Sequence, residues 1–501
     1  MNNLFNNKDI NLSLIGIPIL LSISICLYVF SDVTQSIKVL KSIYENAALQ
    51  LENVFEFGGF LIFVFLVLIS LMPTASKKIT IADRPKFNNI AWCGMMFAAG
   101  MGASILFLSP LEWAHTYNAS PFLLESSDPL LSKYSQSYPL FHWGFIGWAI
   151  FALPAAAFAF GLLKKSDMPL TISALLIKGS TPIERITKAL VDMICILAIL
   201  AGAGVGMGVA FPMIAELLSY LFGFSNNYLF ELFILLICLS IFGTSVYLGL
   251  SQGIKRLSNI NIFLVSALLL IIFIVGPTAF IIKNALSSSA FMMTQFIEMS
   301  FQSTSKFAQS WTVFYWAWWM ALAPFIGTFL IQISNGKTIR QLILGTIFIG
   351  SFASFMHFYV LGGLTSFFFE EGIMDVPSLV KNNPNEVIIL QMLQALPLSS
   401  ILIGMYALIA IIFVCTTYDS CSYVLASIAT NKSSKQPSKV LRLIFAGILV
   451  VQPGVIMFLE GIDSIKYILV ISSIPLLFVF IVLILNMICL LYTSPSPRDV
   501  H

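Results

Sequence analysis

The 501-residue sequence is poor in charge. Asp, Glu, Lys and Arg make up 10% of it, whereas hydrophobic residues make up 58%. Soluble domains carry about 25% charged residues. Together with a mean hydropathy of +0.93, this scarcity excludes an ordinary soluble domain and predicts an integral membrane protein built from many helices. The net charge of +3 gives no basis for a nucleic-acid partner and has to be interpreted loop by loop.

The groups that most enzymatic chemistry needs are also scarce. There are four histidines, and His115, His142 and His357 do not form a metal motif. The seven cysteines fall in or beside apolar segments without metal-ligand spacing, so we expect buried free thiols and no disulfide framework. No ATP-binding loop is present, and we expect no cofactor. These absences argue against a membrane enzyme and an ATP-driven pump.

Long apolar runs dominate the chain instead. The polar N-terminus is followed by an apolar segment without a small-residue cleavage site, which predicts a first transmembrane helix and not a signal peptide. Twelve spans are predicted: 11–30, 55–73, 89–110, 140–163, 188–221, 228–250, 259–282, 309–334, 339–367, 397–427, 440–459 and 465–492.

Basic residues in the loops test this arrangement. With twelve crossings and an inside N-terminus, 19 of the 26 Lys and Arg residues fall in inside segments and 7 in outside segments. Cytoplasmic loops carry an excess of Lys and Arg. The distribution therefore predicts a multi-pass membrane protein with both termini in the cytoplasm, and we expect the membrane to be a bacterial-type inner membrane.

The most unusual stretch is residues 311–342, WTVFYWAWWMALAPFIGTFLIQISNGKTIRQL. It contains four of the eight tryptophans: Trp311, Trp316, Trp318 and Trp319. A single Trp here would be explained by lipid anchoring or packing. A cluster of four also suits a cation that carries methyl groups, because the faces of aromatic rings are negative. Leu322, Phe325 and Phe329 continue the helix face of Trp318.

Two further spans carry features that a plain membrane helix lacks. The third contains FAAGMGASILFLSPLEW, whose glycines favour either close helix packing or a helix break that lines a site at the midplane. The fourth begins FHWGFIGWAIF. Trp143 and Trp148 lie about 140° apart on an ideal helix, so they cannot face one small ligand without a bend. We expect Glu112, His115 and His142 near the outer interface.

The tenth span contains FVCTTYDSCS, with Thr416, Thr417, Asp419 and Ser420 in an apolar helix. Polar groups there are costly unless they have partners. One interpretation is hydroxyls bonded back to helix carbonyls together with a structural Asp419. The other is a sodium site, because hydroxyl and carbonyl oxygens suit a hard cation.

These motifs together resemble the betaine/choline/carnitine transporter (BCCT) family. The match covers most of residues 55–490 and includes the tryptophan run, PFIGTF, the ISNGKTIR loop, GMGAS and the TTYDS segment. The resemblance implies an all-α polytopic fold of the leucine-transporter type, with two inverted five-helix repeats. The implied division is an N-terminal segment 1–88 with two peripheral helices, a first repeat 89–285, an external connection 286–308, a second repeat 309–492 and a short tail 493–501.

The resemblance also implies site residues. The substrate would contact Trp143, Trp148, Phe151, Trp318, Trp319, Leu322, Met101 and Ser104. Sodium would be held by Ala98, Met101, Phe413, Thr416 and Thr417. A second sodium site of coupled members uses a threonine pair where this chain has Leu197 and Ala201. The resemblance also implies that choline-selective members carry an acidic residue at the position of Ser104, where this chain has none.

The implied function is secondary transport of a quaternary-ammonium solute such as glycine betaine or carnitine, coupled to sodium. Proton-coupled choline uptake or substrate exchange is the alternative within the family, with His115 or Asp419 as proton carriers. A channel or a membrane enzyme is the alternative from a different functional class of protein. Membrane lipid and, by family resemblance, two further copies in a homotrimer are the expected partners.

Overall fold

The structure is a computed structural model, and it describes residues 11–81, 86–99, 102–248, 251–301, 307–430, 437–459 and 462–492. These residues are helical almost throughout. The described part contains no β-strand, and one isolated β-bridge joins Lys78 and Thr338. The predicted all-α polytopic class is therefore confirmed.

Nine helices within the described ranges are long and apolar enough to cross a membrane. They are Ser13–Ser31, Glu52–Leu71, Pro129–Lys164, Pro182–Phe222, Tyr228–Tyr247, Ser310–Ile333, Ile339–Glu370, Ser399–Ile428 and Lys466–Leu491. A tenth span is formed if the pair Asn259–Val275 and Thr278–Thr294, bent by 111°, is counted as one. The remaining two predicted spans correspond to the short helices α5 and α6 and to α22. The count of twelve and the inverted repeats remain predictions.

The elements that build the interior of the molecule have the following bounds. They are α2 (Ser13–Ser31), α4 (Glu52–Leu71), α5 (Asn89–Ala99), α6 (Ala103–Leu108), α7 (Glu112–Ala119), α8 (Pro129–His142), α9 (Phe145–Lys164), α11 (Pro182–Phe222), α12 (Tyr228–Leu248), α13 (Ser251–Val275), α14 (Thr278–Thr294), α16 (Val313–Ile333), α17 (Ile339–His357), α18 (Gly363–Glu370), α21 (Ser399–Ile428), α22 (Lys439–Leu459) and α23 (Ile462–Tyr492).

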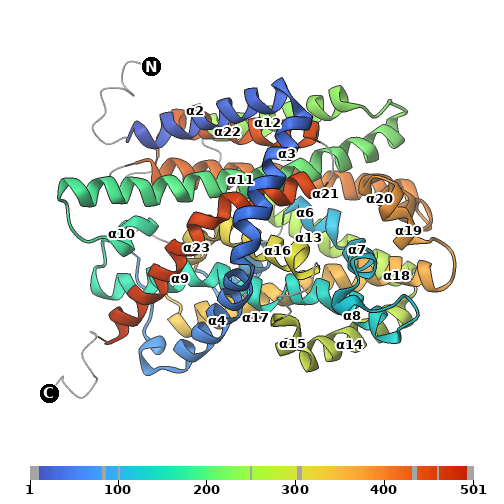
Figure 1. Ribbon diagram of the computed structural model, residues 1–501, viewed down its shortest axis with the longest axis horizontal. Coiled ribbons are helices and arrows are strands. Elements are labelled where there is room, and N and C mark those ends of the chain that lie inside the picture. Colours follow the sequence, from blue (N-terminus) through green and yellow to red (C-terminus); the bar gives the residue numbers. More distant parts are fainter. Residues whose placement is uncertain are drawn as a thin grey trace.

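Shorter or peripheral elements connect them. They are α3 (Val33–Ile43), α10 (Ile172–Leu176), α15 (Phe296–Ser300), α19 (Val376–Asn382) and α20 (Asn385–Gln394), together with short 3₁₀ and π-helical turns. In Figure 1 the long helices α9 and α11 run across the picture, and α4 crosses their direction.

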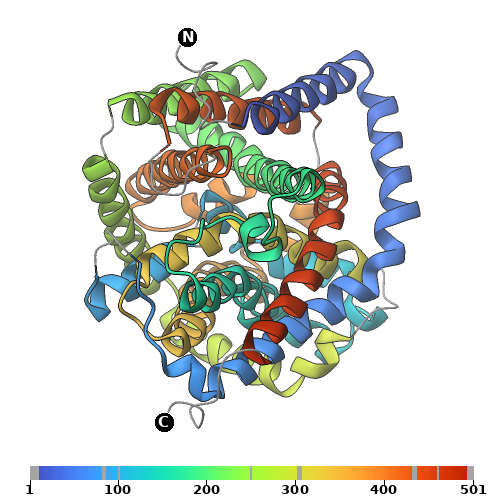
Figure 2. The same ribbon diagram turned by 90° about the vertical axis from the view of Figure 1, so that its left-hand side faces the viewer.

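Helix α16 forms the centre of the packing. It contacts α9, α11, α23 and α4, and Figure 2 shows it surrounded by other elements. Almost all of its residues are buried, including Trp316 and Trp319. Glycine permits part of this closeness, because a Cβ at Gly327 would meet the ring of Pro154 at 2.7 Å. The tryptophan-rich stretch is thus an interior helix, and the lipid-anchoring interpretation is wrong for it.

Two helices break where the sequence places glycine. Helix α5 ends at Ala99, and α6 begins at Ala103 after Gly102, whose backbone is extended (φ −119°, ψ 176°). Helix α8 ends at His142, and α9 begins at Phe145 after Gly144. Residues at such ends have backbone groups without helical partners. Polar backbone groups are therefore freed at these helix ends.

The ISNGKT loop joins α16 to α17 and holds the segment before α5. The Ile79 N–H donates to the Lys337 carbonyl (2.8 Å), and the Gly336 N–H donates to the Ile79 carbonyl (2.8 Å). Gly336 has a φ of +85°, which suits glycine. Thr338 and Gln341 then form a capping box that starts α17. We call this contact between residues 77–81 and 334–339 the loop latch.

Gly350 allows Trp148 to pack directly against α17. An added Cβ at Gly350 would overlap the indole ring of Trp148. We expect Gly350→Ala to lower stability by about 1–3 kcal/mol through overpacking, measured as a lower thermal midpoint in detergent. Gly243→Ala on α12, where a Cβ would meet nothing within 4 Å, is the matched control. Equal midpoints for both variants would contradict the close packing.

Candidate functional site

A cavity of ≈ 340 Å³ lies among the broken and central helices. Its walls come from α5, α6, α9, α11, α13, α16 and α21, together with the α8–α9 link. The lining residues include Ser104, Trp143, Phe151, Gly202, Asn261, Tyr315, Trp318, Trp319, Leu322, Phe325, Phe329, Phe413, Thr416 and Thr417. None of the residues that line it carries a formal charge. The volume is within the range of about 300–1,000 Å³ that is usual for small-molecule sites.

The structure brings most of the predicted substrate residues to this cavity. Six of the eight line it: Ser104, Trp143, Phe151, Trp318, Trp319 and Leu322. Trp148 does not line it. Its side chain is fully buried, and its indole N–H donates to Ser354 Oγ (3.1 Å). Met101 lies outside the described residues.

Five aromatic rings from the α8–α9 link, α9 and α16 form one side of the cavity, which we call the aromatic box. Trp143 lies 5.7 Å from Trp319 and 6.1 Å from Trp318, measured between ring centroids. Phe151 lies 4.4 Å from Trp319, and Tyr315 lies 5.8 Å from Trp143. All four pairs are tilted or edge-on. Such angles turn ring faces in several directions, as a box around a rounded cationic group requires.

The indole N–H of each tryptophan in the box donates a hydrogen bond to a neighbouring acceptor, which leaves the ring faces free. Trp318 donates to the Gly202 carbonyl of α11 (3.0 Å). Trp319 donates to the His142 carbonyl (3.0 Å), which is free because α8 ends at His142. Trp143 donates to Glu112 Oε2 (2.8 Å). An indole N–H is a donor only, so each ring keeps its orientation as long as its acceptor stays in place.

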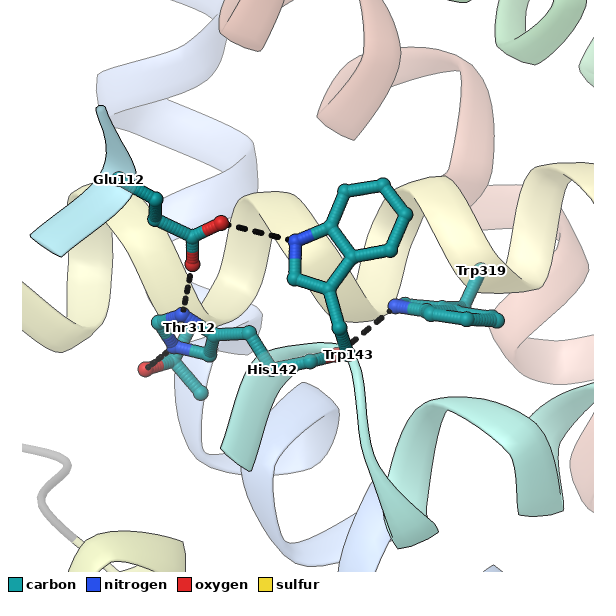
Figure 3. Close-up of polar contacts among 5 residues, drawn as sticks. All are labelled: Glu112, His142, Trp143, Thr312 and Trp319. Carbon is teal, nitrogen blue, oxygen red and sulfur yellow. Dashed lines mark hydrogen bonds and ion pairs between the residues drawn. The ribbon is translucent and has the colours of Figure 1, made fainter. Parts of the chain in front are cut away.

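Glu112 connects these anchors (Figure 3). Its Oε1 lies 3.1 Å from His142 Nδ1, and His142 Nε2 lies 3.1 Å from Thr312 Oγ1. Glu112 and His142 have no exposed surface. Both are therefore enclosed by protein, and their predicted place near the outer interface stays a prediction. Their pairing could not be predicted from the sequence, because the two residues are 30 positions apart.

The predicted place of His115 near the outer interface also stays a prediction. His115 lies on α7 outside the membrane-spanning helices, and its ring hydrogen-bonds to Asn385 Oδ1 (3.2 Å). Burial, and then the charge of Lys466, lowers the pKa of His115 to about 4, and the Asn385 contact opposes this. The imidazole is neutral above that pH. His115 is thus poorly suited to carry a proton at neutral pH.

Two polar side chains that the sequence analysis missed are buried and line the cavity: Asn261 and Tyr315. Both amide atoms of Asn261 make no hydrogen bond to any residue that the structure describes. The Tyr315 hydroxyl lies close to the Glu112 carboxylate and the Trp143 indole. Buried polar groups normally have partners. The Asn261 amide is therefore available to a ligand.

The predicted sodium ligands divide into those that line the cavity and those that do not. Phe413, Thr416 and Thr417 line it. The Thr416 hydroxyl contacts the Ile412 carbonyl (2.8 Å) and the Phe413 carbonyl (3.1 Å), whereas Thr417 makes no side-chain hydrogen bond within the described part of the chain. Ala98 lies in the last turn of α5. Met101 lies outside the described residues.

Asp419 takes the structural role that one interpretation gave it. Its Oδ1 accepts from Arg442 at 2.8 Å. Asp419 is not among the residues that line the cavity. Among the described residues, no group of three or more His, Cys, Asp or Glu side chains could hold a metal ion.

The chain is similar to known membrane transporters. A family model described as "BCCT, betaine/carnitine/choline family transporter" matches residues 13–495. The glycine betaine transporter OpuD of Bacillus subtilis (strain 168) is 30% identical over 421 residues, which cover 83% of this chain and 80% of OpuD. The betaine/ectoine transporter LcoP of Corynebacterium glutamicum is 31% identical over 429 residues, or 83% of this chain and 67% of LcoP. A carnitine transporter of Acinetobacter baumannii is 28% identical over 438 residues, or 85% and 79% of the two chains.

Trp318 offers a direct test of the aromatic box. A cation–π contact in a desolvated site is worth about 0.5–2 kcal/mol. We expect Trp318→Leu to raise the Kd for a trimethylammonium solute roughly 2- to 30-fold, measured by titration calorimetry on purified protein. Trp148→Phe, which alters a tryptophan outside the cavity, should leave the Kd within about twofold. Unchanged affinity in a well-folded Trp318→Leu protein would remove Trp318 from the site.

Proposed function

Because the chain belongs to the betaine/carnitine/choline transporter family, we propose that it carries a zwitterionic trimethylammonium solute, such as glycine betaine or carnitine, across the membrane by alternating access. The observation that carries the proposal is the aromatic box in a cavity without charged side chains. The relatives are named transporters, and a transporter needs no reactive group in such a cavity.

The trimethylammonium end of the solute suits the ring faces of the box. Its methyl groups prevent it from donating N–H hydrogen bonds, so it gains little from polar side chains. Tryptophan faces attract such a cation electrostatically. The anchored indoles of Trp143, Trp318 and Trp319 keep their faces in place before the solute arrives, which lowers the ordering cost of binding.

The carboxylate end needs hydrogen-bond donors. The Asn261 amide lines the cavity and has no partner within the described residues. The Tyr315 hydroxyl also lines the cavity, close to Glu112. Both groups are neutral, as a solute with no net charge requires, and no Lys or Arg lines the cavity. Choline carries the same cationic end but lacks the carboxylate, so it would leave the Asn261 amide unpaired. The site therefore favours betaine or carnitine over choline.

Sodium is the coupling ion that we propose. Thr417 presents a hydroxyl to the cavity without another partner in the described chain, and Thr416 and Phe413 lie beside it. Oxygen ligands of this kind suit a hard cation. The threonine pair of a second site is replaced by Leu197 and Ala201, and no Lys or Arg lies between residues 189 and 254 to substitute for an ion. One sodium ion per cycle follows.

The sodium proposal predicts a simple concentration dependence. Initial uptake at fixed pH and voltage should rise hyperbolically with sodium, with a Hill coefficient near one. Thr417→Ala removes one ligand and should shift the curve to higher sodium. A wild-type rate that does not respond to sodium would end the proposal, and a Hill coefficient near two would show a second ion site. Saturation of the rate with solute also separates a transporter from a channel.

Ser104 tests the choice of solute. It lines the cavity and is neutral. We expect Ser104→Asp to shift preference towards choline, because a carboxylate compensates a ligand with net positive charge and repels the carboxylate of betaine. Competition of labelled glycine betaine uptake by unlabelled choline measures the shift, with Ser104→Asn as the uncharged control. Wild-type uptake of choline in preference to betaine and carnitine would contradict the proposed substrate class.

A further inference from the structure

The contacts of Glu112 identify an additional functional residue behind the wall of the cavity. Its carboxylate does not line the cavity. One oxygen accepts the Trp143 indole N–H at 2.8 Å, and the other lies 3.1 Å from His142 Nδ1. Because the indole can only donate, Oε2 must be an unprotonated acceptor. The orientation of Trp143 is therefore set by the position of this carboxyl group.

The same carboxyl group acts on a second tryptophan through His142. The imidazole is held between Glu112 Oε1 and Thr312 Oγ1, and the backbone carbonyl of His142 accepts the Trp319 N–H at 3.0 Å. His142 is the last residue of α8, and α9 begins at Phe145. Holding the ring at both nitrogens fixes the residue whose carbonyl anchors Trp319, as Figure 3 shows.

Packing alone does not explain a carboxylate at this place. A fully buried ionisable group in a membrane protein is costly, and an apolar side chain of similar volume would fill the space at less cost. Glu112 comes from α7, His142 from the end of α8, and Thr312 from the turn before α16. The group thus connects the elements that contribute the two halves of the aromatic box.

We propose that Glu112 is a positioning residue of the solute site, which sets the orientation of Trp143 directly and of Trp319 through His142. The identity of the solute rests on the function proposed above, whereas the orientation of the tryptophans does not. Glu112 touches no ligand, so its effect on affinity must pass through the rings that it orients.

Two substitutions separate positioning from charge. Glu112→Ala leaves the Trp143 N–H and His142 Nδ1 without a partner, and we expect the Kd for glycine betaine to rise roughly 5- to 100-fold. Glu112→Gln can still accept from Trp143 with its oxygen and donate to His142 Nδ1 with its amide, if His142 takes the tautomer protonated at Nε2. Its Kd should stay within about threefold of wild type. Equal losses in both variants would show that charge matters, and would overturn the proposal.

A double-mutant cycle tests the route through Trp143. In a Trp143→Phe background the indole N–H is already gone. The fold-increase in Kd caused by Glu112→Ala should therefore be at least about threefold smaller there than in the wild-type background. Equal factors in the two backgrounds would show that Glu112 does not act through Trp143. Glu56→Ala serves as the matched control, because Glu56 is a buried carboxyl on α4 that does not line the cavity.

A measurement without solute separates this proposal from the proposed function. The ¹⁹F NMR signal of Trp143 in protein labelled with 5-fluorotryptophan is identified by its absence in Trp143→Phe. In the ligand-free protein we expect Glu112→Ala to shift or broaden this signal and Glu112→Gln to preserve it. An unchanged signal in Glu112→Ala overturns the positioning role. A changed signal in a protein whose wild type does not bind betaine or carnitine supports positioning and rejects the proposed substrate instead.

Discussion

An indole N–H inside a membrane protein has no water to bind, and this constraint organises the centre of the molecule. The three tryptophans of the aromatic box satisfy it with three different acceptors: a helix carbonyl for Trp318, the carbonyl at a helix end for Trp319 and a carboxylate for Trp143. Unpaired polar groups cost several kcal/mol in such surroundings. Each acceptor therefore fixes a ring as well as pairing a donor, and the cavity obtains oriented ring faces without a charged residue in its lining.

The site also requires backbone groups that are free to accept hydrogen bonds, and breaks in the helices supply them. An unbroken helix keeps its carbonyl and N–H groups within its own hydrogen-bond ladder. The end of α8 at His142 releases the carbonyl that anchors Trp319. The same break interrupts the helix at Trp143 and Gly144. Trp143 lines the cavity, whereas Trp148, one turn into α9, packs against Gly350. The irregular backbone thus lies within protein and beside a cavity, where a membrane protein tolerates it.

Several features of this site could be predicted from the amino-acid sequence alone. The tryptophan run, the glycines near residue 102 and the hydroxyls near residue 416 are local and unusual, and all three segments line one cavity. Trp148 could not be separated from Trp143 by motif, because the choice depends on a break of only two residues. The buried pairing of Glu112 with His142 and the free amide of Asn261 depend on distant segments. The periodicity of apolar residues along the sequence does not show which polar groups from distant segments come into contact in the fold.

The loop latch has a mechanical consequence. It joins residues 77–81 to the link between α16 and α17 by three backbone hydrogen bonds, and Lys337 adds a bond to Asn89 at the start of α5 and lies 5.4 Å from the Trp92 ring. These contacts resist separate displacement of the two segments. In the alternating-access cycle that we propose, the loop latch would therefore couple a displacement of α16 to the segment that leads into α5.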